Sequence, residues 1–148
     1  MKARFKNGLS AYSGKADGIV YCYNRYLNAV YVRVNVYPTL TQENTRIGST
    51  TSNLFGITPS RGYKDDMSDY LLKYRCLRAN ASKSIFTWPN LYIKLMYDMA
   101  KQLEGIDLRS LTRDEIYLNN LPCISVKSAV EAGLLPAVYD YAVYDHMI

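Results

Sequence analysis

Hydrophobic and polar residues alternate most strictly along residues 18–37. Between positions 30 and 36, valine occupies every second position and is separated by polar or aromatic residues. This period of two is typical of a β-strand with two chemically different faces. Residues 19–24 alternate in the same way, and the asparagine-rich residues 24–28 favour a turn. The sequence therefore predicts a β-hairpin that ends at Pro38, because proline has no N–H for the strand ladder.

After the hairpin, apolar residues recur at steps of three and four, the period of an amphipathic helix. The two strongest stripes predict helices over residues 60–78 and 88–104, which we expect to pack as an antiparallel pair and form the core. Weaker patterns predict three further helices, over residues 42–55, 113–118 and 125–132. Serine or threonine at the predicted starts supports these boundaries, at Thr41, Thr87, Thr112 and Ser125.

The two ends of the chain lack a helical period. Residues 1–17 are expected to form an extended basic arm. In residues 137–148 the alternation of period two returns, so we expect an extended tail that adds to a sheet edge. Asp140 and Asp145 in this tail are opposite in charge to the arm, which would permit the two ends to pair. We therefore predict one α+β domain over residues 18–148, with the hairpin packed on the helix pair.

The length of 148 residues suffices for one ordinary domain with its own core. No run reaches the roughly 18 apolar residues of a membrane-spanning helix, and residues 1–14 lack the apolar segment of a secretory signal. We expect a protein that is made in the cytoplasm, has no signal peptide or transmembrane segment, and has no membrane partner.

The formal net charge of +5 is concentrated near the N-terminus. Residues 1–37 hold six basic residues and one acidic residue, Asp17, whereas the remaining 111 residues hold 12 of each sign. Such asymmetry is typical either of a solvated basic arm or of contact with nucleic acid or an acidic protein surface. The candidate contact residues are Lys2, Arg4, Lys6, Lys15, Arg25 and Arg33.

The sequence offers little catalytic chemistry. Its one histidine, His146, lies near the C-terminus, where we expect the chain to fray and to fix a general base poorly. The three cysteines have no C-x-x-C spacing and are expected to be buried free thiols, at Cys22, Cys76 and Cys123. No phosphate loop or dinucleotide motif occurs. We therefore expect no enzyme activity, no cofactor and no metal.

Tyrosine is unusually frequent, with 15 residues against three phenylalanines. Tyrosine supplies large amphipathic contact area and is enriched at protein interfaces, although it also covers the rims of ordinary cores. If the valines of the second strand face a core, an outward row suited to a partner forms from Tyr31, Arg33, Asn35 and Tyr37. The candidate interface residues are Tyr21, Tyr23, Tyr26, Tyr31, Arg33, Tyr37, Tyr139 and Tyr141.

Three hypotheses on function follow from these patterns. The leading one is a non-enzymatic structural protein that self-associates into a multicopy assembly of identical subunits. The first alternative is a nucleic-acid-binding protein, because aromatic and basic residues on a strand can stack on bases and contact phosphates. The second alternative is a small adaptor or regulatory module.

A group of short motifs carries a resemblance over about residues 14–55. These motifs are Gly14-Lys15, Gly18-Ile19-Val20-Tyr21, Tyr31-Val32-Arg33, Pro38, Thr41-Gln42 and Arg46. The stretch resembles the opening of uncharacterised bacterial and prophage-associated proteins. Those proteins often have Asn-Pro before the threonine, where this chain has Pro38-Thr39-Leu40. The resemblance implies a multicopy virion or assembly-type protein without known catalysis.

Overall fold

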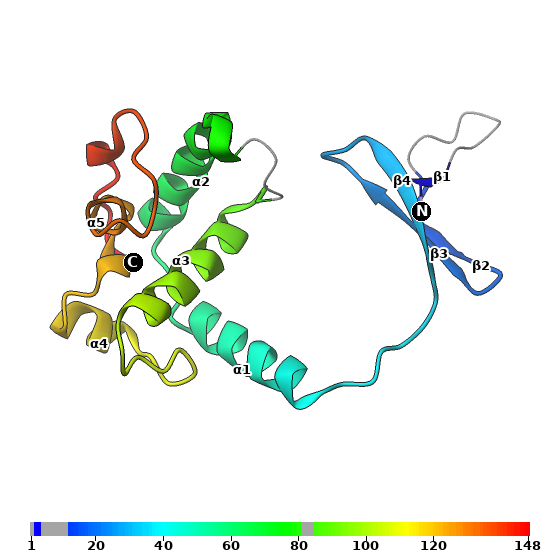
Figure 1. Cartoon of the computed structure of the whole chain (residues 1–148), viewed down its shortest axis with the longest axis horizontal. Coiled ribbons are helices and arrows are strands. Elements are labelled where there is room, and N and C mark those ends of the chain that lie inside the picture. The colour runs from blue at the N-terminus through cyan, green and yellow to red at the C-terminus, as the bar shows by residue number, and fades with distance from the viewer. Residues whose placement is uncertain (1, 4–11, 81–84) are drawn as a thin grey trace. The chain divides into compact units, whose positions relative to one another are not determined.

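The computed structural model describes residues 2–3, 12–80 and 85–148. The fold is α+β, as predicted, and the chain divides into two compact units, Met1–Leu40 and Thr41–Ile148. Figure 1 shows a sheet in the first unit and helices in the second. The predicted organisation, an arm over residues 1–17 and one domain over residues 18–148, differs from this division. The difference arises because strands on both sides of the hairpin extend it into a sheet with contacts of its own.

The first unit is a four-stranded antiparallel sheet. Its strands are β1 (Lys2–Ala3), β2 (Gly14–Ala16), β3 (Ile19–Asn24) and β4 (Ala29–Val34), in the spatial order β1-β4-β3-β2. The predicted hairpin is formed by β3 and β4, although β4 ends at Val34, three residues before the predicted end. Strands β1 and β2 lie within the residues predicted to form an extended arm. Arg4 and Lys6 of that arm lie outside the described residues.

The turns that flank β3 depend on residues that tolerate a left-handed backbone. Between β2 and β3, Asp17 and Gly18 have φ values of 50° and 75°. Between β3 and β4, the Asn24 side chain accepts hydrogen bonds from the backbone N–H groups of Tyr26 and Leu27. Asn28 closes that turn with a φ of 44°. The asparagines therefore set the hairpin turn, as their positions in the sequence predict.

The second unit begins with three long helices. They are α1 (Gln42–Gly56), α2 (Arg61–Cys76) and α3 (Trp88–Gln102). The predicted bounds of these helices are correct to within two residues at each end. Thr41 caps α1 by accepting a hydrogen bond from the Asn44 N–H, as predicted, whereas the Thr87 side chain makes no capping bond. Helices α2 and α3 run in opposite directions, as expected for the predicted pair (Figure 1).

Short helices follow in the C-terminal part. They are α4 (Arg113–Leu118), α5 (Val126–Glu131) and the 3-10 turns η1 (Arg78–Asn80), η2 (Pro122–Ile124) and η3 (Tyr141–Val143). Thr112 and Glu115 form the predicted capping box at α4, and Ser125 caps α5. None of residues 137–148 lies in a strand, so the prediction of an extended tail that joins a sheet edge is wrong. The tail instead buries Val138, Tyr144 and Ile148, while Asp140 and Ala142 between them are exposed.

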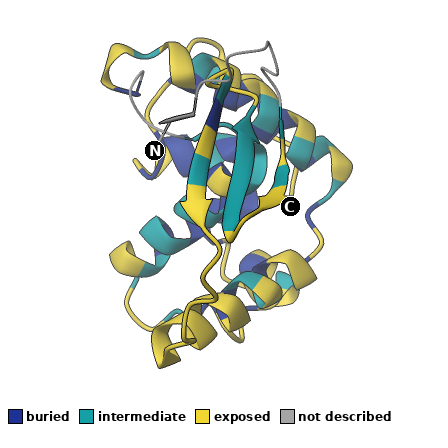
Figure 2. Ribbon diagram, turned by 90° about the vertical axis from the view of Figure 1, so that its right-hand side faces the viewer, coloured by how far each residue is buried: buried dark blue, intermediate teal, exposed yellow. Residues whose placement is uncertain are grey.

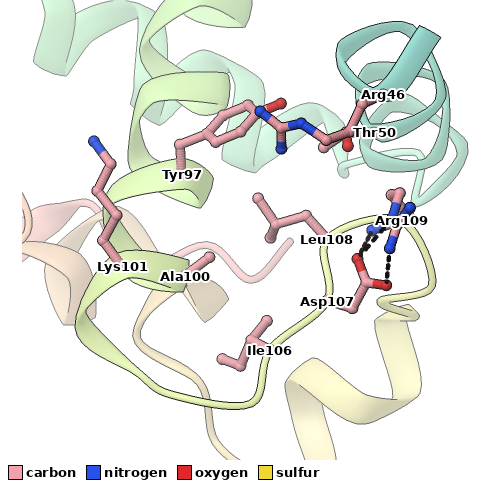
Figure 3. Close-up of a pocket in the computed structure, with 9 residues that line it drawn as sticks. All are labelled: Arg46, Thr50, Tyr97, Ala100, Lys101, Ile106, Asp107, Leu108 and Arg109. Carbon is pink, nitrogen blue, oxygen red and sulfur yellow. Dashed lines mark hydrogen bonds and ion pairs between the residues drawn. The ribbon is translucent and has the colours of Figure 1, made fainter. Parts of the chain in front are cut away.

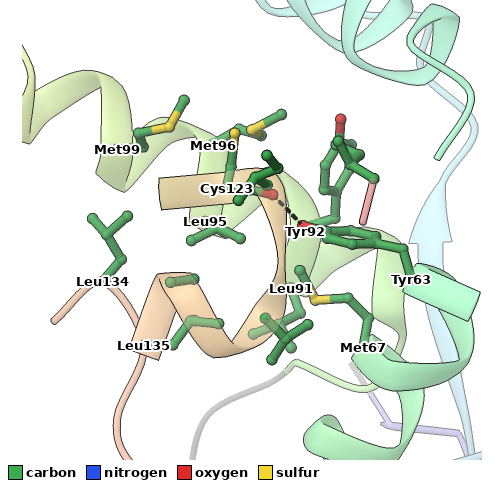
Figure 4. Packing of buried hydrophobic residues seen from close by; sticks show 14 of the residues in the cluster. Tyr63, Met67, Leu91, Tyr92, Leu95, Met96, Met99, Cys123, Leu134 and Leu135 are labelled. Carbon is green, nitrogen blue, oxygen red and sulfur yellow. Dashed lines mark hydrogen bonds between the residues drawn. The ribbon is translucent and has the colours of Figure 1, made fainter. Parts of the chain in front are cut away.

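The hydrophobic core of the second unit lies where α2 and α3 meet the C-terminal segments. Figure 4 shows Leu134 and Leu135 close to the side chains that α3 presents, among them Leu95 and Met99. These C-terminal segments cover the apolar sides of α2 and α3. All members of the core cluster lie between Leu54 and Ile148. Helix α1 contributes Leu54, near its C-terminal end, to the core cluster, whereas Ile47 nearer its start is 46% exposed.

Buried tyrosines in the core form hydrogen bonds with backbone carbonyl groups elsewhere in the second unit. The hydroxyl groups of Tyr63, Tyr70 and Tyr92 donate to the backbone oxygens of Cys123, Pro136 and Leu54, at 3.1, 2.6 and 3.1 Å. Burial raises the pKa of all three phenols, so they remain neutral donors. Each phenol fills core volume and also satisfies a carbonyl group. Part of the tyrosine enrichment therefore serves the fold rather than an interface.

Candidate functional site

The register of the sheet sorts its side chains onto two faces. Because side chains alternate along a strand, residues paired across β3 and β4 lie on the same face. One face carries Tyr21 paired with Val32 and Tyr23 paired with Val30. We call this the apolar face and define it by six residues: Ile19, Tyr21, Tyr23, Val30, Val32 and Val34. Gly14 pairs with Tyr21 at its edge, and the Tyr12 ring crosses there, 5.3 Å from the Tyr21 ring.

The opposite face combines basic and aromatic side chains. Lys15, Val20 and Arg33 form one cross-strand row, and Cys22 pairs with Tyr31 in the next. We call this the basic face and define it by Lys15, Val20, Cys22, Tyr31 and Arg33. A hydrogen bond between Tyr31 and Cys22 raises the pKa of the Tyr31 phenol. Tyr31 is therefore a neutral aromatic group at physiological pH, two residues from Arg33 on the same face of β4.

The predicted row of Tyr31, Arg33 and Tyr37 is found in part. Tyr31 and Arg33 share the basic face and are exposed, whereas Tyr37 lies beyond the end of β4 and is 83% exposed. The alternating valines do not share one environment. Val30 is 4% exposed but Val34 is 69% exposed, and Figure 2 shows β4 changing from buried to exposed along its length.

The other predicted interface residues are dispersed. Tyr21 and Tyr23 lie on the apolar face, and Tyr26 is exposed in the hairpin turn. Tyr139 and Tyr141 belong to the second unit, where Tyr139 is 82% exposed and Tyr141 packs against the core. The structure therefore groups Tyr21 with Tyr23, and Tyr31 with Arg33, but it does not make one surface of the whole set.

The candidate basic residues separate in the same way. Lys15 and Arg33 come together on the basic face, and Arg25 is exposed in the hairpin turn. Lys2 pairs with Tyr31 in the backbone register of β1. Lys15 and Arg33 therefore form a cluster on the basic face, and the backbone register places Lys2 opposite Tyr31 of the same face.

Exposed apolar residues concentrate in the hairpin turn, in β4 and in the residues that follow it. Among the described residues, 15 large hydrophobic side chains are exposed, and seven of them lie within residues 26–40. These seven are Tyr26, Leu27, Tyr31, Val34, Val36, Tyr37 and Leu40. About a tenth of the chain thus carries nearly half of the exposed large hydrophobic side chains, although Tyr31 and Val34 lie on opposite faces of the sheet.

The histidine is better ordered than the sequence predicts. The Nδ1 atom of His146 lies 2.9 and 3.0 Å from the two carboxylate oxygens of Asp66, so the tail does not fray there. The carboxylate raises the pKa of this imidazole. An aspartate–histidine pair orients a general base, but no described serine, threonine or cysteine side chain hydrogen-bonds the imidazole. No pattern in the sequence could have paired two residues 80 positions apart.

The three cysteines differ in how far they are buried. The prediction of three buried thiols is correct for Cys123, but Cys22 is only half-buried and Cys76 is exposed at the end of α2. Burial raises the pKa of the Cys123 thiol to about 12.

Within residues 2–3, 12–80 and 85–148, no three histidine, cysteine, aspartate or glutamate side chains gather as metal ligands would. The described helices include none with the length and apolar character needed to cross a bilayer.

No protein-family model, curated protein or solved structure matches the chain.

Proposed function

We propose that the protein is a non-enzymatic structural protein that self-associates into a multicopy assembly through its N-terminal sheet. The concentration of exposed apolar side chains in residues 26–40 is the observation that carries this proposal. A single sheet layer cannot enclose a core, so stable sheets cover at least one face with a second layer. The resemblance of the motifs in residues 14–55 to prophage-associated proteins would imply the same function.

The outer edge of β4 is the part best suited to pair with a second copy. The pairing of β1 with β4 ends at Tyr31, so from Arg33 onward this edge borders no strand among the described residues. Identical edges can pair antiparallel about a two-fold axis, and the contact then closes on itself. Such pairing would extend the apolar face across two subunits through Val34 and Val36. Pro38 and the charge of Arg33 limit further growth along this edge.

Size-exclusion chromatography with light scattering tests the proposal. We expect the wild-type protein to exceed the monomer mass of 16.9 kDa at tens of micromolar. The double substitution Val34→Lys and Val36→Lys should shift it to the monomer, because two buried ammonium groups oppose the contact. Leu118→Lys is the matched control, since Leu118 is 86% exposed in the second unit. A wild-type protein that stays monomeric over this range would refute the proposal.

The basic face favours a second candidate function, binding of single-stranded nucleic acid. Lys15 and Arg33 flank Val20, and Tyr31 lies in the neighbouring row, so phosphate contacts and base stacking could occur on one surface. Fluorescence anisotropy with single- and double-stranded DNA across a salt series tests this candidate. Binding should weaken with salt, and Lys15→Gln with Arg33→Gln should reduce the salt slope by about two. Absence of salt-sensitive binding at low ionic strength rules the candidate out.

A further inference from the structure

A cavity of about 360 Å³ opens in the second unit between α1, α3 and residues 106–109. Figure 3 shows the side chains that line it. Ala100, Ile106 and Leu108 form an apolar wall, and each also belongs to or packs against the hydrophobic core. Its volume lies at the lower end of the range for small-molecule sites, which is about 300–1,000 Å³. The cavity therefore suits a compact ligand with an apolar body.

Three cationic side chains surround this apolar wall, each from a different element. They are Arg46 from α1, Lys101 from α3 and Arg109 from the segment after α3. Asp107 is the one carboxylate among the lining residues, while Glu43 and Asp98 outside the lining form ion pairs with Arg46 and Lys101. A ligand with an anionic group would compete with these carboxylates for the three cations.

The two arginines have carboxylate partners, but some of their N–H donors remain free. Arg46 donates through Nε and Nη2 to Glu43, and Arg109 donates through the same two atoms to Asp107. A guanidinium carries five N–H groups, so the Nη1 group of each arginine stays available for a second acceptor. Both pairs join residues close in sequence on the surface, where ion pairs stabilise weakly and yield to a competing anion.

The hydroxyl group of Tyr97 gives an independent indication of a ligand. It is buried and hydrogen-bonds no other described residue. Arg46 lines the same cavity, but its guanidinium is itself a donor and cannot accept this hydrogen (Figure 3). A buried hydroxyl without an acceptor is unfavourable, so a ligand oxygen that reached it after a small shift of the neighbouring side chains would satisfy both Tyr97 and Arg46.

The walls of the cavity are held in place without a ligand. The side-chain nitrogen of Asn53 donates to the backbone oxygens of Leu108 and Leu111, at 3.0 and 2.9 Å. These two bonds fix the segment after α3 against α1. A preformed site avoids the cost of ordering a loop when the ligand binds.

We propose that this cavity binds a phosphate monoester of a compact apolar or aromatic alcohol. A phosphate monoester carries a charge of about −1.5 to −2 and three acceptor oxygens, which suits two arginine forks and one phenol. Its organic part lies against Ala100, Ile106 and Leu108. This site is separate from the N-terminal sheet, so it stands whether or not the protein self-associates.

Phenyl phosphate is the probe for the test. We expect saturable shifts of the amide NMR signals of residues 46–50, 97–101 and 106–109 when the full-length protein is titrated at low ionic strength. Inorganic phosphate lacks the apolar body and phenol lacks the charge, so each should bind at least about tenfold more weakly. Equal affinity for inorganic phosphate and phenyl phosphate would contradict a role for the apolar wall and overturn the proposal.

Two variants and one control make the test specific. Tyr97→Phe removes only the unsatisfied hydroxyl, and we expect it to weaken phenyl phosphate binding about tenfold without loss of thermal stability. Arg46→Gln should weaken binding by at least about tenfold, because it also leaves Glu43 to repel the anion. Arg61→Gln removes the same charge from a side chain that is 95% exposed, and it should change binding less than about twofold.

Three outcomes would overturn the proposal. One is no saturable shift at millimolar phenyl phosphate. Another is wild-type affinity in both Tyr97→Phe and Arg46→Gln. The third is an equal loss in Arg61→Gln, which would show that the protein attracts anions through its net charge alone.

Discussion

The imidazole of His146 is held by the carboxylate of Asp66, 80 residues earlier in the chain. Its Nδ1 lies 2.9 Å from one carboxylate oxygen, and its backbone N–H donates to the other at 3.1 Å. The Asp66 side chain is only 10% exposed, whereas the His146 side chain is 61% exposed. Two further bonds join the end of the chain to the same unit, from Ser60 to the Met147 oxygen and from Ile148 to the Ile124 oxygen. The C-terminus is therefore an integral part of the helical fold.

Stability should depend on pH through His146. The Asp66 carboxylate raises the imidazole pKa above 6.5 in the folded state, so protonation favours folding. This contribution is complete below the unfolded pKa and is lost as the pH rises through the folded pKa. His146→Gln should therefore lower the melting temperature more at a pH of about 5.5 than at about 8.5. Asp66→Asn should show a similar dependence, and an equal loss at both pH values would contradict this account.

Any side chain at Gly62 should disrupt the pairing of His146 with Asp66. A Cβ atom at Gly62 would lie 2.6 Å from the His146 ring, so the ring would have to move away from Asp66. Gly62→Ala should therefore return the His146 pKa, measured by NMR titration, toward its ordinary value. Gly48→Ala is the matched control, since a Cβ there meets open space inside α1, and it should stabilise by about 0.5–1 kcal/mol. A greater stabilisation by Gly62→Ala than by Gly48→Ala would show that the ring contact is unimportant.

Loss of a hydroxyl should lower stability where the phenol is hydrogen-bonded, but not where it has no partner. Tyr63→Phe leaves the Cys123 carbonyl without its donor in the core, and we expect a loss of about 1–3 kcal/mol in the free energy of unfolding. Tyr97→Phe removes a hydroxyl that has no partner among the described residues, so it should cost nothing. Urea denaturation of both variants measures the difference. Equal losses would contradict the hydrogen-bond assignment.

The helical unit should fold without the sheet. Residues 41–148 contain every member of the core cluster, so this fragment should unfold cooperatively at nearly the same urea concentration as the whole chain. Residues 1–40 form a single sheet layer and should not be stable alone. Circular dichroism during denaturation checks both statements. Loss of the cooperative transition in the larger fragment would show that the helices depend on the sheet.

The three thiols should react in the order of their exposure. Cys76 is exposed and should be alkylated first by iodoacetamide, whereas half-buried Cys22 should follow more slowly. Cys123 is buried with its pKa raised to about 12, so it should react only when the protein unfolds. Mass spectrometry of peptides over time measures the order. Early modification of Cys123 under native conditions would contradict the packing of η2.

The local elements follow from residues close in sequence. The alternation in residues 18–37 and the asparagines at positions 24 and 28 predict the hairpin, because turn and strand preferences act over a few residues. The capping box at Thr112 marks the start of α4, since both of its bonds join residues three apart. The predicted grouping of Tyr31 with Arg33 is correct for the same reason, because alternation assigns them to one face.

What the tertiary structure alone decided are contacts between distant residues. The pair of Asp66 and His146, the cavity between Arg46 and Arg109, and the position of the tail each depend on how helices pack. The sequence determined which residues form helices and strands, because those preferences are local. It did not determine that C-terminal segments would cover α2 and α3, because an apolar stripe specifies that it is buried but not which partner buries it.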